Sequence, residues 1–217
     1  MFRTLLCALI ICALVPAAAL GQEGGEALKE QGAKEMAFGQ LSEKQQKLVV
    51  GMLKKLFKEG KVKAEESIRE NGSFVPYGYV SNHEAEGQFL HIDPEQKMRA
   101  EVAAHAVQKT IITNALRGNL AASGLFMTMA LPEGLKEKTQ KQLEESIEGD
   151  RGIDDVRFLM VELQHLGGLG LLMSVPYWKN NEEEWIFGEP VSQQVEPQLQ
   201  MSVQRMMRKA AQQQKSG

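Results

Sequence analysis

Histidine and carboxylate side chains gather in one short segment of the sequence, which raises the question of a metal site. His83, Glu84, Glu86, His91 and Asp93 all fall within a single expected hairpin. A divalent ion would need three or four such ligands to converge on one point. Residues in a turn are commonly polar because turns are solvated, and His91 and Asp93 already fit a strand end and a helix N-cap. We therefore predict no metal ion and no other cofactor.

Covalent catalysis would need a serine nucleophile. The two cysteines, Cys7 and Cys12, lie within the expected signal peptide 1–21 and would be absent from the mature chain. The sequence has no Gly-x-Ser-x-Gly motif, and Ser123-Gly124 falls inside an expected strand rather than at a sharp turn. Glu162 stands in an otherwise apolar strand, and alternation places it on the solvent side, so we expect it to be exposed. Glycine-rich phosphate-binding motifs are absent. We predict no catalytic residue.

Methionines suggest a second metal chemistry, since exported proteins can bind Cu(I) through thioethers. Met127 and Met129 are two apart on one expected strand, and Met206-Met207 lie in the last expected helix. The first pair continues a leucine-rich stripe, which is typical of a strand that faces the core, so we interpret both as core residues. His165 precedes a glycine-rich turn, and we expect it to be exposed.

Aromatic residues are concentrated in three expected strand segments of a chain that is only 6% aromatic. If the last two of these strands pair across the turn 179–184, Trp178 and Trp185 stand side by side on one face. Cross-strand packing is one interpretation of such residues. The other is a surface that receives a peptide, a glycan or a partner protein, because amphipathic aromatics are favoured at binding sites. The candidate binding residues are Tyr77, Tyr79, Tyr177, Trp178 and Trp185.

The start of the chain has the three parts of a cleavable signal peptide. Arg3 precedes an apolar run, residues 5–15, and the small-residue stretch 16–21 follows. About eleven apolar residues are too few to cross a bilayer, which needs about twenty, so we expect no transmembrane segment in the mature chain and a periplasmic or secreted location. The mature chain would have no cysteine and hence no disulfide. It would keep 24 basic and 28 acidic side chains without a basic block, which argues against nucleic-acid binding.

The spacing of apolar residues predicts the elements that position these side chains. Spacings of three and four predict helices over 42–60, 62–70, 93–116 and from 197 onward, while alternation predicts strands over 73–81, 88–93, 120–131, 156–165, 169–176 and 185–189. Segment 132–152 is a charged, helix-prone insertion with few apolar residues, and we expect it to be loosely attached. The expected organisation is a signal peptide 1–21, a flexible linker 22–40, one α+β domain 41–190, and a C-terminal amphipathic helix and tail 191–217.

Several boundaries of these elements depend on single residues. Gly60 is expected to end the first helix, and Asn71-Gly72 the second. Pro76 lacks an N–H donor and should make its strand an edge or bulged strand. Asp93-Pro94 is expected to cap the third helix, which Gly118 would close.

This order of elements predicts a mainly antiparallel sheet of five to six strands with helices packed on it. It resembles the profilin-like or roadblock-like arrangement, in which a helix, a hairpin, a helix and a three-strand meander share one sheet. Phe74-Val75-Pro76-Tyr77-Gly78 and the segment 156–189, with Glu162, Pro176-Tyr177 and Gly188-Glu189, also resemble small bacterial proteins of uncharacterised function. The resemblance implies a shared fold and no catalytic residue.

The leading hypothesis for function is an exported, non-enzymatic binding or adaptor module of the cell envelope. One alternative is a small envelope hydrolase, and another is a subunit whose methionine-rich last helix docks on a second protein. An unfilled apolar groove would favour binding, whereas a buried carboxylate–histidine cluster in a cleft would favour the hydrolase. Formation of a homo-oligomer is left open.

Overall fold

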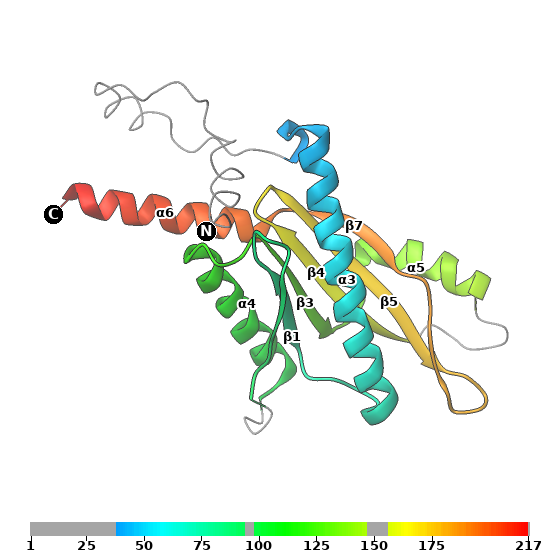
Figure 1. Cartoon of the computed structure of the whole chain (residues 1–217). Coiled ribbons are helices and arrows are strands. Elements are labelled where there is room, and N and C mark those ends of the chain that lie inside the picture. Colours follow the sequence, from blue (N-terminus) through cyan, green and yellow to red (C-terminus); the bar gives the residue numbers. More distant parts are fainter. Residues whose placement is uncertain (1–37, 94–97, 147–155, 217) are drawn as a thin grey trace, which may run out of the picture. The chain divides into compact units, whose positions relative to one another are not determined.

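The computed structural model describes residues 38–93, 98–146 and 156–216, which all lie within the unit Ala37–Gly217 (Figure 1). The expected signal peptide and residues 22–37 of the expected linker lie outside this part. The elements are η1 (Phe38–Gln40), α3 (Glu43–Asn71), β1 (Tyr77–Ser81), β2 (Gly87–Leu90), α4 (Ala100–Leu116), β3 (Ala122–Thr128), α5 (Glu133–Ser146), β4 (Arg157–His165), β5 (Leu169–Lys179), β6 (Trp185–Phe187), β7 (Val191–Val195) and α6 (Gln198–Ser216).

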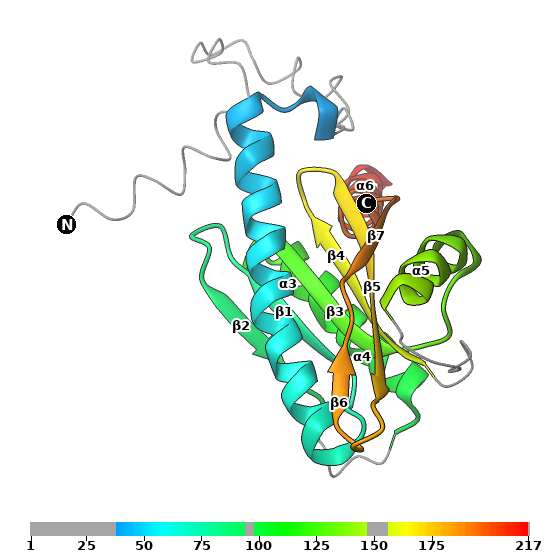
Figure 2. The same ribbon diagram turned by 90° about the vertical axis from the view of Figure 1, so that its right-hand side faces the viewer.

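The strands form one antiparallel sheet in the order β2-β1-β3-β4-β5-β6, and β7 also pairs with β5. The predicted α+β class, with a helix, a hairpin, a helix and a three-strand meander in one sheet, is confirmed. Figure 2 shows α3 on one side of this sheet and α5 and α6 on the other. Helices on both faces bury both sets of side chains of the central strands β3 and β4.

Helix α3 begins where the sequence predicts and runs past its expected end. The Ser42 hydroxyl accepts from the Gln45 N–H at 3.3 Å and the Gln45 side chain accepts from the Ser42 N–H at 2.9 Å, which completes a capping box. The prediction that the helix ends at Gly60 is wrong, because α3 continues until Gly72 adopts a φ of 71°. A Cβ at Gly60 would overlap the ring of Phe126. The glycine therefore lets the helix approach the sheet, and it does not end the helix.

The hairpin of β1 and β2 is present as predicted, but β1 is not an edge strand. Pro76 precedes Tyr77, the first residue of β1, so its missing N–H lies outside the ladder and causes no bulge. Strand β1 pairs with both β2 and β3, and β2 lies at the end of the sheet order. The Asn82 side chain organises the turn by accepting from the Glu84 and Glu86 N–H groups at 2.9 and 3.0 Å.

Helix α4 starts later than predicted. Its N-cap is Arg99, which makes no side-chain cap bond, so the prediction that Asp93 caps the helix is wrong. Residues 94–97 lie outside the described part. Gly118, with a φ of 75°, follows the C-terminus of α4 as expected.

Three hydrophobic clusters fill the space between the sheet and its helices. The cluster under α3 is the largest and contains Leu53, Leu56, Ile68, Tyr77, Phe126, Leu159, Val161 and Tyr177 among its buried residues. On the opposite face α4 and α6 cover a second cluster, which includes Val107, Ile111, Leu125 and Leu199. Leu125 of the predicted stripe is buried, whereas Met129 lies beyond the end of β3 and is 46% exposed.

Helix α5 is attached to the sheet, so the expectation of a loosely attached insertion is wrong. Leu135 and Leu143, two of its few apolar residues, are 0% and 3% exposed. Leu143 packs with Val156, Phe158 and Trp178 in the third cluster. Two apolar contacts a few turns apart are enough to fix a helix whose other positions are polar.

The last two elements are an edge strand and a helix that packs on the sheet. Segment 191–195, expected to belong to the C-terminal helix and tail, forms β7 and pairs with β5 from Gly170 to Ser174. Its residues alternate between exposed and half-buried, which is typical of an edge strand with little apolar signal. Helix α6 follows Pro197 as predicted, and Leu199 anchors it at 4% exposure, whereas Met206 and Met207 are 45% and 64% exposed.

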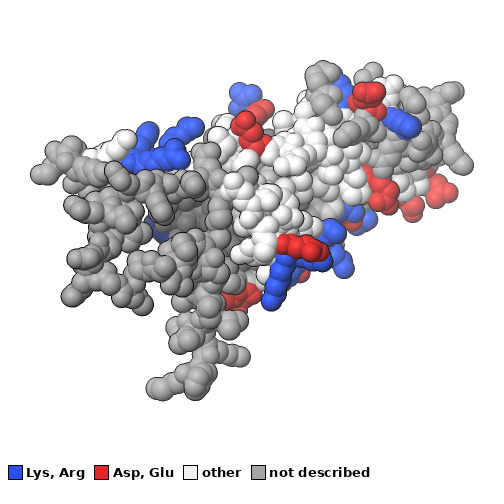
Figure 3. All heavy atoms as spheres, turned by 90° about the horizontal axis from the view of Figure 1, so that it is seen from above, with Lys and Arg blue, Asp and Glu red and all other residues white. Residues whose placement is uncertain are grey.

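Charge is distributed without a large field of one sign on the described part of the face in Figure 3, where small groups of both signs are separated by uncharged surface. Among residues 38–93, 98–146 and 156–216, no helix has the length and apolar character needed to cross a bilayer.

Candidate functional site

The five aromatic residues proposed from the sequence do not form one exposed surface. Four of them, Tyr77, Tyr79, Tyr177 and Trp178, are only 2–7% exposed, and Trp185 is half-buried. The tyrosine rings lie under α3. Cross-strand and helix–sheet packing therefore accounts for most of the aromatic pattern.

Tyr77 and Tyr79 fasten β1 to α3 through their hydroxyl groups. The Tyr77 hydroxyl donates to the Gly60 carbonyl at 2.7 Å, and its ring stacks on Phe126 with centroids 5.0 Å apart. The Tyr79 hydroxyl donates to the Glu59 carboxylate. Burial, followed by the effect of that carboxylate, raises the pKa of Tyr79 to about 12. Burial also raises the pKa of Tyr77, so both hydroxyls stay protonated and act as structural donors.

The two tryptophans lie on opposite faces of the sheet, so the prediction that they stand side by side is wrong. Lys179 is the residue paired with Trp185, and Trp178 is paired with Ile186. A register offset of one residue moves a side chain to the other face. The register follows from the turn, in which the Asn180 N–H donates to the Glu184 carbonyl at 2.9 Å. Trp178 accordingly packs under α5.

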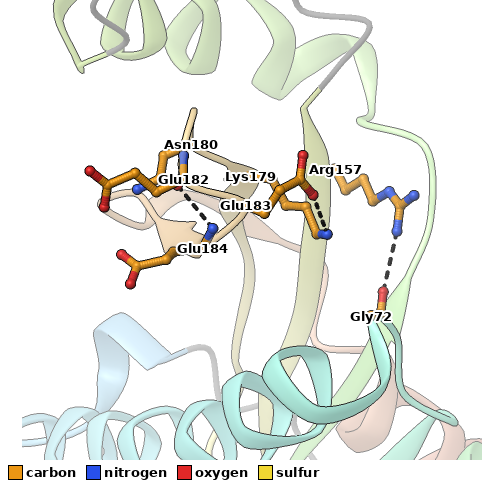
Figure 4. A network of polar contacts seen from close by, with 7 residues as sticks. All are labelled: Gly72, Arg157, Lys179, Asn180, Glu182, Glu183 and Glu184. Atoms are coloured by element: carbon orange, nitrogen blue, oxygen red, sulfur yellow. Dashed lines mark hydrogen bonds and ion pairs between the residues drawn. The ribbon is translucent and has the colours of Figure 1, made fainter.

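Trp185 lies between two cations near the C-terminus of α3. The Arg157 guanidinium is 5.6 Å and the Lys179 ammonium 5.4 Å from the centre of its ring. Figure 4 shows Arg157 extending from β4 toward α3, where it donates to the Gly72 carbonyl at 3.2 Å, while Lys179 pairs with Glu183 at 2.6 Å. Arg157 is thus held at a fixed place beside Trp185, and its guanidinium retains further N–H donors.

A cavity of about 680 Å³, here called the α5 cavity, opens beside Arg157. It lies where β3 leads into α5 and β4 begins. Its lining consists of Gly72, Ser73, Thr128, Met129, Ala130, Leu131, Lys136, Thr139, Gln140, Leu143, Val156, Arg157, Phe158 and Tyr177. The volume is in the range of about 300–1,000 Å³ that is usual for small-molecule sites.

The α5 cavity combines an apolar wall with positive charge and one unsatisfied hydroxyl. Lys136 and Arg157 are its charged lining residues, and none of the described residues that line it is acidic. The Thr139 side chain is 0% exposed, and its hydroxyl has no hydrogen-bond partner among the described residues. A buried polar group without a partner costs about 1–3 kcal/mol, so a partner that reached this hydroxyl would stabilise the folded protein.

The histidine and carboxylate candidates from the sequence are not among the described lining residues of the α5 cavity. His83, Glu84, Glu86, His91 and Asp93 form no cluster that could hold a metal, and no group of three such residues does so within the described ranges. His165 was expected to be exposed but is half-buried. Its Nδ1 accepts from the Gly167 N–H at 2.8 Å, and burial, with a smaller contribution from His83, lowers its pKa to about 4.

Glu162 is also less exposed than predicted, because α4 and α6 cover its face of the sheet. It is half-buried, and this burial raises the pKa of its carboxyl group. Alternation assigned Glu162 to the correct face, opposite Val161 and Leu163. Alternation could not show that helices also cover the face of the sheet on which Glu162 lies.

Sequence reasoning identified Tyr177 of the α5 cavity and missed Arg157 and Thr139. Thr139 lies in a segment whose charge suggested an exposed helix, and Arg157 is an isolated cation at the start of a strand. Neither has a local signal, since the cavity forms from five separate parts of the chain. Comparison of the chain with protein-family models, with curated proteins and with solved structures finds no match.

Proposed function

We propose that this chain is an exported, non-enzymatic binding module of the cell envelope, and that its α5 cavity holds a small monocarboxylate with an apolar body. The observation that carries the proposal is the α5 cavity itself, with a mainly apolar lining, cationic side chains and no acidic residue among the described lining residues. Export rests on the pattern of residues 1–21.

Each part of such a ligand has a counterpart in the cavity. Met129, Leu131 and Phe158 provide apolar surface for the body. Arg157 offers guanidinium N–H groups to a carboxylate, for which this group is well shaped. The buried Thr139 hydroxyl would gain its missing hydrogen-bond partner if the ligand reaches it.

Tryptophan fluorescence provides the binding assay. Trp178 packs with Leu143, Val156 and Phe158, which line the cavity, and Trp185 contacts Arg157. We expect decanoate to change the emission with a saturable curve, and decylamine, of the same length and opposite charge, to do so at much higher concentration. Equal responses to both probes, or no saturable response to decanoate, would overturn the proposal.

Two neighbouring cations give a matched pair of variants. Arg157→Gln should weaken decanoate binding about 10- to 100-fold, because a hydrogen bond to a charged group is worth about 1.5–3 kcal/mol. Lys179→Gln changes a cation at a similar distance from Trp185 that does not line the cavity, so it should leave the affinity unchanged. Equal losses in the two variants would show that the effect comes from general charge and not from the cavity.

A further inference from the structure

A second, smaller cavity lies where α4 and α6 meet the sheet, and it is independent of the ligand proposed for the α5 cavity. Its volume is about 60 Å³, which is room for about four water-sized groups. Six of the ten described residues that line it carry a side-chain oxygen, and they are Gln108, Ser123, Glu162, Gln164, Gln198 and Ser202. We call it the polar cavity.

Gln164 supplies the main evidence that this cavity is made for a ligand. Its side chain is only 4% exposed, and its Oε1 has no hydrogen-bond partner among the described residues. The Nε2 group donates to Glu162 at 2.9 Å and to the Glu196 carbonyl at 3.4 Å, which fixes the orientation of the amide. Exchanging the oxygen and the nitrogen of this amide would place the oxygen against the ionised Glu162 carboxylate. The free acceptor is therefore a consequence of the packing.

Glu162 supplies a negative charge that the cavity does not neutralise. The carboxylate accepts one bond from Gln164, and none of the described lining residues carries a positive charge. Partial burial without a cationic partner disfavours the ionised form, which agrees with the raised pKa of Glu162. A bound cation would relieve this cost and would also give Gln164 Oε1 a partner.

The donor set identifies the class of cation. Carboxylate, amide and hydroxyl oxygens suit hard cations, whereas nitrogen and sulfur ligands would suit zinc or copper. A single carboxylate balances one positive charge. We propose that the polar cavity binds an alkali metal ion, Na⁺ or K⁺, with Glu162 and Gln164 as its principal ligands and the neighbouring polar side chains or water completing the shell.

Such an ion would stabilise the packing of the last helix. The lining residues come from α4, α6, β3 and β4, so the ion would join both helices to the sheet. Leu199, which is 4% exposed, is the main apolar anchor of α6 and lines the same cavity. The folded state alone brings these groups together, and binding to it therefore raises the melting temperature.

The test is a thermal unfolding series on the full mature chain at constant ionic strength, in which choline chloride is replaced stepwise by NaCl or KCl. Choline is too large for the polar cavity and controls for general screening. We expect the melting temperature to rise along a saturating curve in at least one alkali salt, by about 3–6 °C at ten times the dissociation constant. Melting temperatures equal to those in choline chloride in both salts would overturn the proposal.

Two variants separate a site from a bulk salt effect. Glu162→Gln keeps the size of the side chain, removes the half-buried charge and should abolish the dependence on alkali ions while the protein stays folded. Glu101→Gln removes an exposed α4 carboxylate, 72% exposed, and should leave the dependence as in the wild type. Retention of the saturating rise in Glu162→Gln, or its loss in Glu101→Gln, would show that the ion does not bind in the polar cavity.

Discussion

Two glycines in the same helix should respond in opposite directions to replacement by alanine. Gly51 and Gly60 both lie within α3, where alanine is favoured over glycine by about 1 kcal/mol because glycine loses more backbone entropy. At Gly51 a Cβ would meet no atom within 4 Å. We therefore expect Gly51→Ala to stabilise the protein by about 0.5–1 kcal/mol.

Gly60→Ala should destabilise the protein despite the same gain in helix propensity. The added Cβ would overlap the Phe126 ring, because three ring atoms would lie within 2.7 Å of it. The ring is 0% exposed and stacks on Tyr77, whose hydroxyl donates to the Gly60 carbonyl, so it has no space into which to turn. Overpacking costs about 1–3 kcal/mol and more in severe cases. With about 1 kcal/mol returned by propensity, we expect a net loss of about 2 kcal/mol.

Urea unfolding followed by circular dichroism measures both effects, and the variants should differ by about 3 kcal/mol in free energy of unfolding. Phe126→Leu in the Gly60→Ala background should recover part of the loss, because the smaller side chain makes room for the Cβ. A double-mutant cycle gives this coupling directly. A Gly60→Ala variant as stable as the wild type, or additive effects of the two substitutions, would refute the close approach of α3 to β3.

Two further predictions concern the tryptophans and the histidine at the end of β4. Trp178→Ala should lower the free energy of unfolding in urea by about 3–5 kcal/mol, because Trp178 is 7% exposed under α5. Trp185 is half-buried, so Trp185→Ala should cost less. Equal losses would contradict the assignment of the two rings to different faces. The folded-state pKa of His165, about 4, lies below its ordinary value of 6.5, so the folded state takes up this proton less readily than the unfolded state does. The wild type should therefore lose stability as the pH falls from about 6.5 to 4. His165→Asn should lose less over the same interval in unfolding measured at several pH values, and an unchanged loss would show that another group is responsible.

Local patterns in the sequence are enough to predict the class of fold and most of the elements. Periodicity changes from three and four to two where α3 ends and the hairpin begins. The capping box at Ser42 marks the start of α3 and Gly72 marks its end, but the break expected at Gly60 is absent. These signals are local: they depend on backbone geometry and on which face of an element is apolar. For the same reason the order of helix, hairpin, helix and meander was predictable.

Packing between distant elements sets the role of the residues for which these local signals are misleading. Gly60 has the local signature of a helix end and is a packing residue, because only the folded chain brings Phe126 against it. Alternation along β5 and β6 could not reveal that Trp178 and Trp185 face opposite ways, since a register shift of one residue reverses the face. Arg157 and Thr139 meet at the α5 cavity only after β4 and α5 have packed together. A cavity is a property of the space between elements, and the sequence of each element specifies only its own surface.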